Sequence, residues 1–151
     1  MSSPVEATHP PRASRPSHKA PLRGVHFAAL AALIATPGVA IGRLLPDKHG
    51  WLLAGLLAAS SLITYALYAS DKGRAQRGEW RIPEKILHLW ELLGGWPGGF
   101  LAQRRLRHKS AKVSYLATFW FIVVFHHYIA IDALLGWRLF GHARAWLTAL
   151  S

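Results

Sequence analysis

An acid–imidazole–acid stripe is the feature of this 151-residue sequence that could most directly do chemistry. Glu84, His88 and Glu91 recur at i, i+4 and i+7, so in a helix all three side chains would face the same way. Such a stripe could hold a divalent metal or transfer protons as a general acid and base. Together with Arg107, these residues are the candidate catalytic set, for a reaction that the sequence does not identify.

Two further histidines, His126 and His127, lie deep in an apolar stretch with Asp132 nearby. Ionisable groups inside a membrane span are costly, which makes them functional candidates by default. His88, His126 and His127 are therefore candidate metal ligands, although no recognised spacing such as H-E-x-x-H occurs. The sequence has no cysteine, which excludes thiolate chemistry and cysteine–zinc sites. Beyond such a divalent metal, no cofactor is expected.

The competing interpretation of these ionisable groups is structural. In it, Glu84 and Glu91 form ion pairs with the arginines of residues 104–107, and Asp71 pairs with Arg81. The histidines would then hydrogen-bond between helices.

The elements that must position these side chains are apolar blocks. Hydrophobic residues make up 52% of the chain and charged residues 17%, against about 25% charged in soluble domains. Residues 25–42, 51–70 and 114–131 each form a block long enough to be a span candidate. A chain of this length cannot enclose three such helices in a soluble core. We therefore predict an all-α integral membrane protein with spans near 25–45, 51–70 and 114–136.

The basic residues indicate how the chain is oriented. The net charge is +11, and lysines and arginines gather in segments 12–23, 71–85 and 103–114. The positive-inside rule places all three segments in the cytoplasm, so the expected location is the bacterial inner membrane. Residues 1–23 hold five prolines and are expected to form a disordered basic arm, and residues 137–151 a short amphipathic tail.

The first span has a second interpretation. A basic region precedes it and Gly38-Val39-Ala40 has the small residues that signal peptidase prefers, so cleavage there stays an alternative. Cleavage would leave the rest of the topology unchanged.

The apolar segment 86–102 lies between two basic segments, so it must enter and leave the membrane on one side. Its centre is Gly94-Gly95-Trp96-Pro97-Gly98-Gly99. Pro97 disfavours helical geometry at Trp96, and each glycine costs ~1 kcal/mol relative to alanine in a helix. We predict two half-helices, about 84–93 and 98–108, in a re-entrant or interfacial hairpin (84–108). The alternative is a fourth span with glycine-based close packing, which would move five basic residues outside.

A compact basic cluster follows the glycine-rich centre. A cluster of this kind beside a span is typical of a binding site for anionic lipids, in which each basic residue contributes ~1 kcal/mol of binding free energy. The tryptophans are expected to form an interfacial belt. The candidate headgroup residues are Arg104, Arg105, Arg107, Lys109 and Lys112, and the expected belt is Trp51, Trp80, Trp90, Trp96 and Trp137.

An ordered set of residues between about 60 and 125 carries a family resemblance. It consists of an Asp-Lys pair after a span, Ala, Trp-Arg, Glu, a Gly-Gly/Pro-Gly centre and Arg-His-Lys before the last span. The positions are Asp71, Lys72, Ala75, Trp80, Arg81, Glu84, Gly94, Gly95, Pro97, Gly98, Arg107, His108, Lys109 and Lys112. This pattern resembles the bacterial membrane-protein family called domain of unknown function 1294. Some of its members carry a cold-shock domain, which implies cytoplasmic nucleic acid, but this sequence holds no such domain.

Three hypotheses for function follow. The leading one is a small, non-enzymatic inner-membrane protein whose basic cytoplasmic face binds anionic lipid, a protein partner or a second copy of the chain. The second is an intramembrane enzyme or transporter with its acid–histidine site at the hairpin. The third is a membrane tether for nucleic acid, which rests on charge and family resemblance alone.

Overall fold

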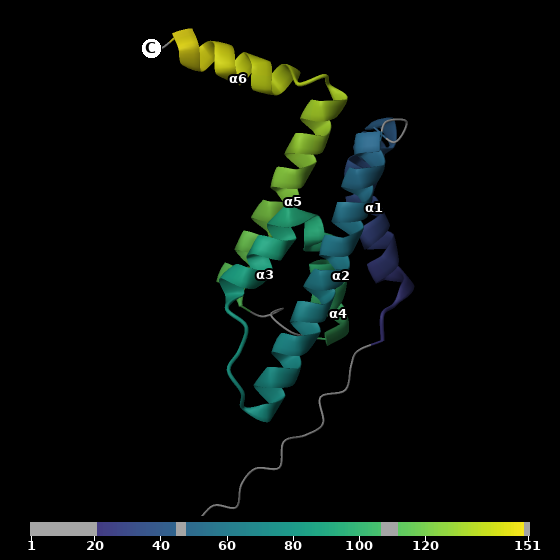
Figure 1. The fold of residues 1–151 in the computed structure, drawn as a ribbon, viewed down its shortest axis with the longest axis vertical. Helices are drawn as coiled ribbons and strands as arrows, with labels where there is room; N and C mark the ends of the chain where they lie inside the picture. Colours follow the sequence, from purple (N-terminus) through teal and green to yellow (C-terminus); the bar gives the residue numbers. More distant parts are fainter. Residues whose placement is uncertain (1–20, 45–47, 107–111, 150–151) are drawn as a thin grey trace, which may run out of the picture.

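The computed structural model describes residues 21–44, 48–106 and 112–149, and these ranges consist of helices joined by short connections without any strand (Figure 1). The arm predicted for residues 1–23 therefore falls almost entirely outside the described residues. The elements in order are α1 (Gly24–Leu44), α2 (Lys48–Arg77), α3 (Glu84–Trp90), a π-helical turn η1 (Glu91–Gly95), α4 (Trp96–Leu106), α5 (Val113–Leu134) and α6 (Arg138–Ala149).

Helices α1, α2 and α5 are each long and apolar enough to cross a membrane, as the sequence predicts. Many of their large apolar side chains are exposed, among them Leu56, Leu62, Phe121 and Val124. Because so much exposed apolar surface is stable only in an apolar solvent, these helices indicate a membrane protein.

Helix α2 is longer than the span predicted at 51–70, since it continues to Arg77. Arg74 and Arg77 favour this extension because cations stabilise the negative end of the helix dipole. The helix stops at Gly78, which adopts φ 70°, and the N–H of Glu79 donates to the carbonyl of Arg74 at 3.0 Å. This is a Schellman termination, in which glycine takes the left-handed position without a Cβ penalty.

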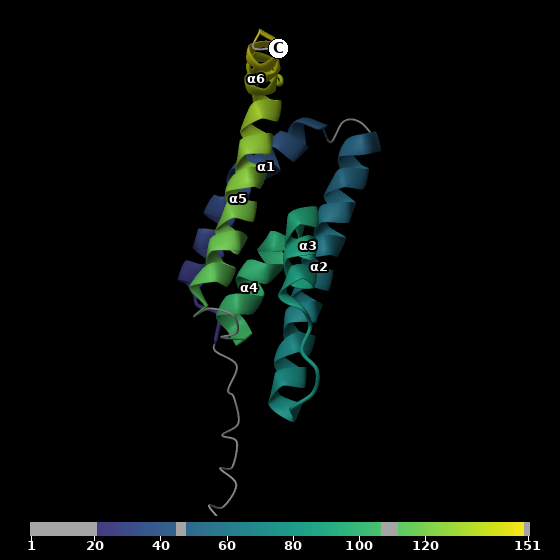
Figure 2. The same cartoon turned by 90° about the vertical axis from the view of Figure 1, so that its left-hand side faces the viewer.

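Segment α3–η1–α4 forms a helical hairpin that lies between α2 and α5 (Figure 2). Its open ends lie at the same end of the molecule as the C-terminus of α2 and the N-termini of α1 and α5 (Figures 1 and 2). Its tip faces the middle of the bundle, where Gly94 lies against Leu57 of α2. We refer to the end that holds the hairpin's open ends as the basic end, and to the other as the far end.

The break in the hairpin does not have the predicted cause. Gly94 reverses the chain, with φ 95° and ψ 5°, a conformation that costs glycine little. Trp96 is helical (φ −56°, ψ −31°), so the prediction that Pro97 would break the helix at Trp96 is wrong. Pro97 instead lies in the first turn of α4, where its missing N–H removes no hydrogen bond. The first half-helix runs from Glu84 to the residue before Gly94, as predicted for 84–93. The second begins at Trp96 and not at 98, and its predicted end at 108 lies outside the described residues.

Two of the other glycines, one in η1 and one in α4, allow the hairpin to approach α2 closely. A Cβ on Gly98 would overlap the carbonyl oxygen of Ser61, and one on Gly95 would overlap the Thr64 hydroxyl. Small residues of this kind let helix backbones pack in a membrane, where van der Waals contact replaces the hydrophobic effect. Glycine-based packing, expected only if the segment were a fourth span, is thus a property of the hairpin.

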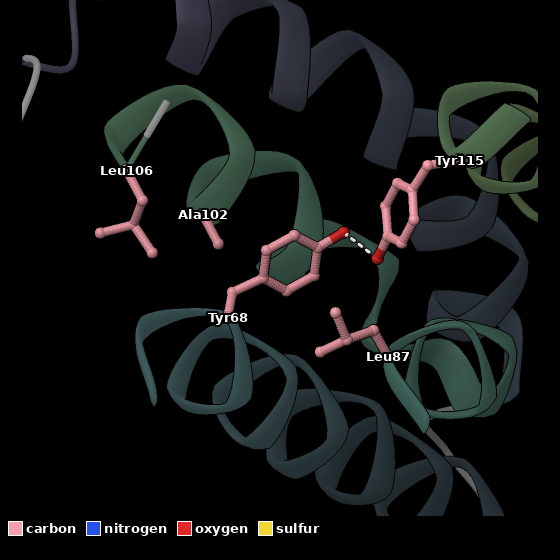
Figure 3. Close-up of a cluster of buried hydrophobic side chains, with 5 residues drawn as sticks. All are labelled: Tyr68, Leu87, Ala102, Leu106 and Tyr115. Carbon is pink, nitrogen blue, oxygen red and sulfur yellow. Dashed lines mark hydrogen bonds between the residues drawn. The ribbon is translucent and has the colours of Figure 1, made fainter. Parts of the chain in front are cut away.

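The hairpin also supplies much of the buried core. Leu87, Ala102 and Leu106 pack with Tyr68 of α2 and Tyr115 of α5 (Figure 3). A second cluster joins Trp96 and Phe100 to apolar side chains of α5. Trp96 is 3% exposed, so its assignment to an interfacial belt is wrong.

At the far end, α6 leaves the bundle at an angle to α5 (Figure 1). Gly136 and Trp137 both have positive φ, 69° and 61°. The buried carboxylate of Asp132 accepts hydrogen bonds from the N–H groups of Leu139 at 2.8 Å and Phe140 at 3.1 Å. Asp132 therefore caps the start of α6, a structural role that explains one ionisable group of the third span.

Candidate functional site

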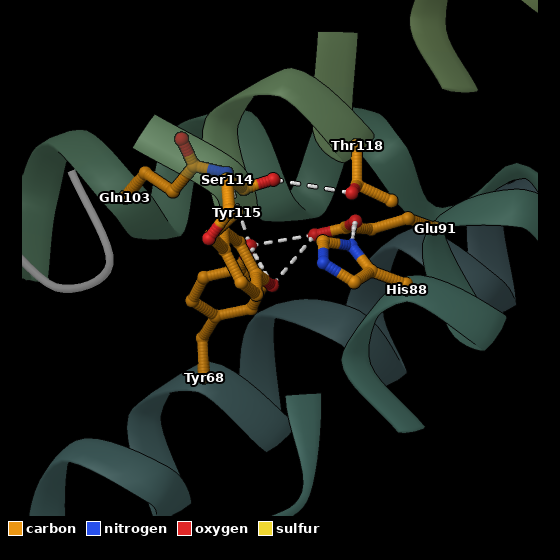
Figure 4. Close-up of polar contacts among 7 residues, drawn as sticks. All are labelled: Tyr68, His88, Glu91, Gln103, Ser114, Tyr115 and Thr118. Carbon is orange, nitrogen blue, oxygen red and sulfur yellow. Dashed lines mark hydrogen bonds and ion pairs between the residues drawn. The ribbon is translucent and has the colours of Figure 1, made fainter. Parts of the chain in front are cut away.

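The centre of the candidate site is Glu91, whose side chain is fully buried. It sits at the start of η1 and meets side chains from α2, α3 and α5 (Figure 4). Tyr68 donates to Oε1 at 2.5 Å, and Nδ1 of His88 lies 2.7 Å from Oε2. The ring of His88 stacks on that of Tyr115, with centroids 4.1 Å apart. We call Tyr68, His88, Glu91, Gln103 and Tyr115 the Glu91 cluster.

The hydrogens of the Glu91 cluster can be assigned from its distances. Tyr115 has one hydroxyl hydrogen, and its contact with the Tyr68 oxygen (2.6 Å) is shorter than that with Glu91 (3.2 Å). Tyr68 therefore accepts from Tyr115 and from Gln103 Nε2 at 3.0 Å, and donates its own hydrogen to Glu91. This uses both lone pairs and the hydrogen of the Tyr68 hydroxyl.

The arrangement is satisfied throughout. Across the described residues, no buried side-chain nitrogen or oxygen lacks a hydrogen-bond partner. A carboxylate accepts only, so an ionised Glu91 requires a hydrogen on His88 Nδ1. The His88 side chain is 16% exposed, which makes it the member through which a proton could leave or reach Glu91. The chemistry available is proton transfer along Glu91, Tyr68 and Tyr115, or simple anchoring of the hairpin.

The structure divides the stripe predicted from Glu84, His88 and Glu91. His88 and Glu91 contact each other, but Glu84 lies nearer the basic end and pairs with Lys112 at 2.7 Å. Glu91 bonds with Tyr68 and His88, and the Tyr115 hydroxyl lies 3.2 Å from Oε1, so its expected ion pair with an arginine is wrong. Arg107, the fourth candidate, lies outside the described residues.

The predicted metal ligands do not converge. Nδ1 of His126 lies 2.8 Å from the carbonyl of Ile122, and Nδ1 of His127 lies 2.8 Å from that of Val123. Both histidines thus bond one turn back on α5 itself, and His127 also lies beside Trp96, with ring centroids 6.0 Å apart. Within the described ranges, no three His, Asp or Glu side chains are grouped closely enough to hold a metal.

Several residues of the sequence motif tie the hairpin to its neighbours. The buried carboxylate of Asp71 accepts from the Ile82 N–H at 2.8 Å, with Arg81 at 4.0 Å, as the structural interpretation expected. Lys72 donates to the carbonyl of Leu106, which satisfies one of the acceptors left open at the end of α4.

The remaining motif residues and headgroup candidates have varied surroundings. The guanidinium of Arg104 lies 3.3 Å above the Phe100 ring, and Arg105 is half-buried. Trp80 is 93% exposed in the loop before α3. In that loop, hydrogen bonds from Arg77 lower the pKa of the Glu79 carboxyl. His108 and Lys109 lie outside the described residues.

Sequence reasoning missed three members of the Glu91 cluster, Tyr68, Gln103 and Tyr115. The two tyrosines lie near the basic ends of α2 and α5, where an aromatic residue with a hydroxyl is typical of a membrane interface. Gln103 stands beside a run of arginines and resembles a solvated residue. A signal was nevertheless present, because Glu91 is a carboxylate in an apolar segment and must find hydrogen-bond donors.

Part of the chain matches a known protein family. Residues 61–115 match the family model described as "Protein of unknown function (DUF1294)". This match agrees with the family predicted from the motif, over residues 61–115 of the 151-residue chain. The DUF1294 segment begins within α2 and ends at Tyr115, so it contains the whole hairpin and every member of the Glu91 cluster. No curated protein and no solved structure matches the chain.

Proposed function

We propose that this chain is an integral protein of the bacterial inner membrane, with its N-terminus in the cytoplasm. Its hairpin enters and leaves the bilayer from the cytoplasmic side. The basic residues around the hairpin's open ends bind the anionic headgroups of the cytoplasmic leaflet. The protein is a non-enzymatic scaffold in this account, and the Glu91 cluster holds the hairpin in place.

The observation that carries this proposal is the gathering of charge at one end. Of the 13 lysines and arginines within the described residues, nine lie at the basic end and four at the far end or on α6. Such an excess supports a cytoplasmic position for the basic end. The nine are Arg23, Lys72, Arg74, Arg77, Arg81, Lys85, Arg104, Arg105 and Lys112.

The saturation of the Glu91 cluster supports a structural role for it. A catalytic carboxylate must reach a substrate, but Glu91 has no exposed surface and both of its oxygens already accept hydrogen bonds. Irregular backbone such as that at Gly94 is tolerated at membrane depth only when protein or a wet cavity covers it. Gly94 and Gly95 are buried, which fits a hairpin that sits within the bilayer.

If the basic end binds headgroups, neutralising basic residues of α4 should weaken its binding to anionic lipid specifically. We expect Arg104→Gln/Arg105→Gln to lower cross-linking to phosphatidylglycerol about tenfold or more, since each basic residue near the surface contributes ~1 kcal/mol. The probe is a phosphatidylglycerol with a photoreactive group beside the headgroup, used on the full chain in nanodiscs and mapped by peptide mass spectrometry. Phosphatidylcholine with the same group should show little change.

The matched control removes two charges from the far end, Lys48→Gln/Arg138→Gln, and should leave cross-links to α4 unchanged. An equal loss for both lipids, or the same loss in the control, would contradict headgroup binding at the basic end. Added salt should weaken the phosphatidylglycerol signal, because exposed charges are screened within about 8 Å at 0.15 M.

A second function, proton-coupled enzyme or transporter, has one observation in its favour. His88 connects a fully buried carboxylate to the surface, and the tyrosine pair could relay a proton. Glu91→Gln separates the two functions. A scaffold tolerates glutamine, since an amide can still accept and donate hydrogen bonds, whereas proton transfer requires the acid.

A further inference from the structure

The hairpin fills only the basic-end half of the space between the long helices. Beyond its tip, at Leu92 and Leu93, the structure holds a cavity of about 360 Å³. Side chains of α1, α2 and α5 form the other walls, Leu57 and Ala130 among them. Because the hairpin is about half as long as the helices around it, a space remains between those helices beyond its tip. No residue of the Glu91 cluster lines this cavity.

The lining of this cavity is almost wholly apolar. Among the described residues that line it, His126 is the one ionisable residue, and Nδ1 of that ring already bonds to the Ile122 carbonyl. A water molecule needs two to four polar partners to be stable in a cavity, and these walls do not supply them. The volume falls within the range of about 300–1,000 Å³ typical of ligand sites. A hydrocarbon chain suits this lining, and a sugar or nucleotide does not.

One aromatic and one cationic side chain lie on the far-end side of the cavity. Trp137 lines the cavity with φ 61°, an unusual backbone conformation for a bulky residue that requires support from the surrounding structure. The backbone N–H of Trp137 donates to the backbone carbonyl of Asp132 at 2.8 Å. Nη1 of Arg43 lies 3.4 Å from the carbonyl of Leu134, which places the guanidinium between α1 and α5 beside the residues that line the cavity.

We propose that this cavity binds one acyl chain of an anionic phospholipid, with the phosphate against Arg43. The lipid comes from the leaflet at the far end, so the site is separate from the headgroup site of α4. Arg43 supplies the charge complementarity, and Trp137 marks the level at which chain and headgroup meet. The inference rests on the membrane embedding proposed above but not on the role of the basic end.

The test uses the full chain in nanodiscs with phosphatidylglycerol that carries a diazirine at the end of one acyl chain. We expect cross-links to concentrate on the peptides that contain Leu92, Leu93 and Ala130. Ala40→Leu adds bulk to a buried wall residue of the cavity and should lower these cross-links about tenfold, an effect of the size expected for a pocket altered by a few methylene groups. Ala32→Leu, at an exposed position of the same helix, should have no effect.

Arg43→Gln distinguishes the contribution of the headgroup to binding from that of the acyl chain. We expect it to lower the cavity cross-links of phosphatidylglycerol and to leave those of phosphatidylcholine nearly unchanged. A thermal unfolding curve for each variant checks that it is folded, and Ala133→Leu provides a second filled cavity if Ala40→Leu fails to fold. Cross-links spread over the exposed faces of α1 and α5, and unchanged by filling, would overturn the proposal. If cavity labelling is as expected while Arg104→Gln/Arg105→Gln has no effect on α4, headgroup binding at the basic end fails and this site stands.

Discussion

Replacing Gly98 with valine is expected to lower the free energy of unfolding by at least ~3 kcal/mol, because overpacking against a rigid neighbour cannot relax. A Cβ at this position would overlap the backbone carbonyl of Ser61 in α2. Backbone inside a membrane helix cannot move aside as the end of a flexible side chain can. The hairpin would separate from α2, and the clusters around Tyr68 and Phe100 would lose their packing.

Gly55→Val is the matched control, since Gly55 lies within α2 and a Cβ there would meet no other atom within 4 Å. Thermal unfolding of both purified variants in detergent, followed by near-ultraviolet circular dichroism, measures the difference. A Gly98→Val protein as stable as Gly55→Val would contradict the close approach of α4 to α2.

Glu91→Ala is expected to have the next largest effect, a destabilisation of about 3 kcal/mol from an unpaired buried hydroxyl and a new void. Tyr68 would lose the acceptor of its hydrogen, and the buried side chains around η1 would lose their central contact. Glu91→Gln should retain most of the stability, because its amide oxygen can accept from Tyr68. Its amide nitrogen can donate to His88 once that ring changes tautomer.

The contrast between these two substitutions, measured by the same unfolding experiment, decides what the Glu91 cluster does. If the cluster is a scaffold, Glu91→Ala should lose much stability and Glu91→Gln little. Glu91→Gln should also bind headgroups as the wild type does. If Glu91→Gln is fully stable but abolishes a cellular or transport phenotype that the wild type supports, the cluster handles protons and the scaffold account fails. Tyr115→Phe serves as a milder control, since it removes one donor and keeps the ring that stacks on His88.

The helices could be predicted from the sequence because each depends on a long, uninterrupted apolar pattern. The three blocks correspond to α1, α2 and α5, and the glycine-rich composition of the segment between them correctly indicates a break in the helix. The cause of the break could not be predicted, since a proline disrupts a helix interior but suits its first turn. Only the position of the turn, at Gly94, shows that Pro97 lies in the first turn of α4.

The partners of the ionisable groups were harder to predict, because they depend on contacts between distant segments. Glu84 and Glu91 are seven residues apart on one helical stripe, but one pairs with Lys112 near the basic end and the other is enclosed by tyrosines. Periodicity gives the face of a helix and not the depth at which each residue sits. The same limit explains Trp96, which has an interfacial residue type but packs in the core.

The measurement that tests the central claim most directly is thiol accessibility in intact cells. The chain has no native cysteine, so Gln76→Cys, Ser114→Cys and His49→Cys each report one position without background. The account predicts that a membrane-impermeant reagent labels His49→Cys from outside, and labels Gln76→Cys and Ser114→Cys only after the cells are opened. Labelling of Ser114→Cys from outside, with Gln76→Cys still protected, would show that the hairpin segment crosses the membrane and would contradict the re-entrant topology.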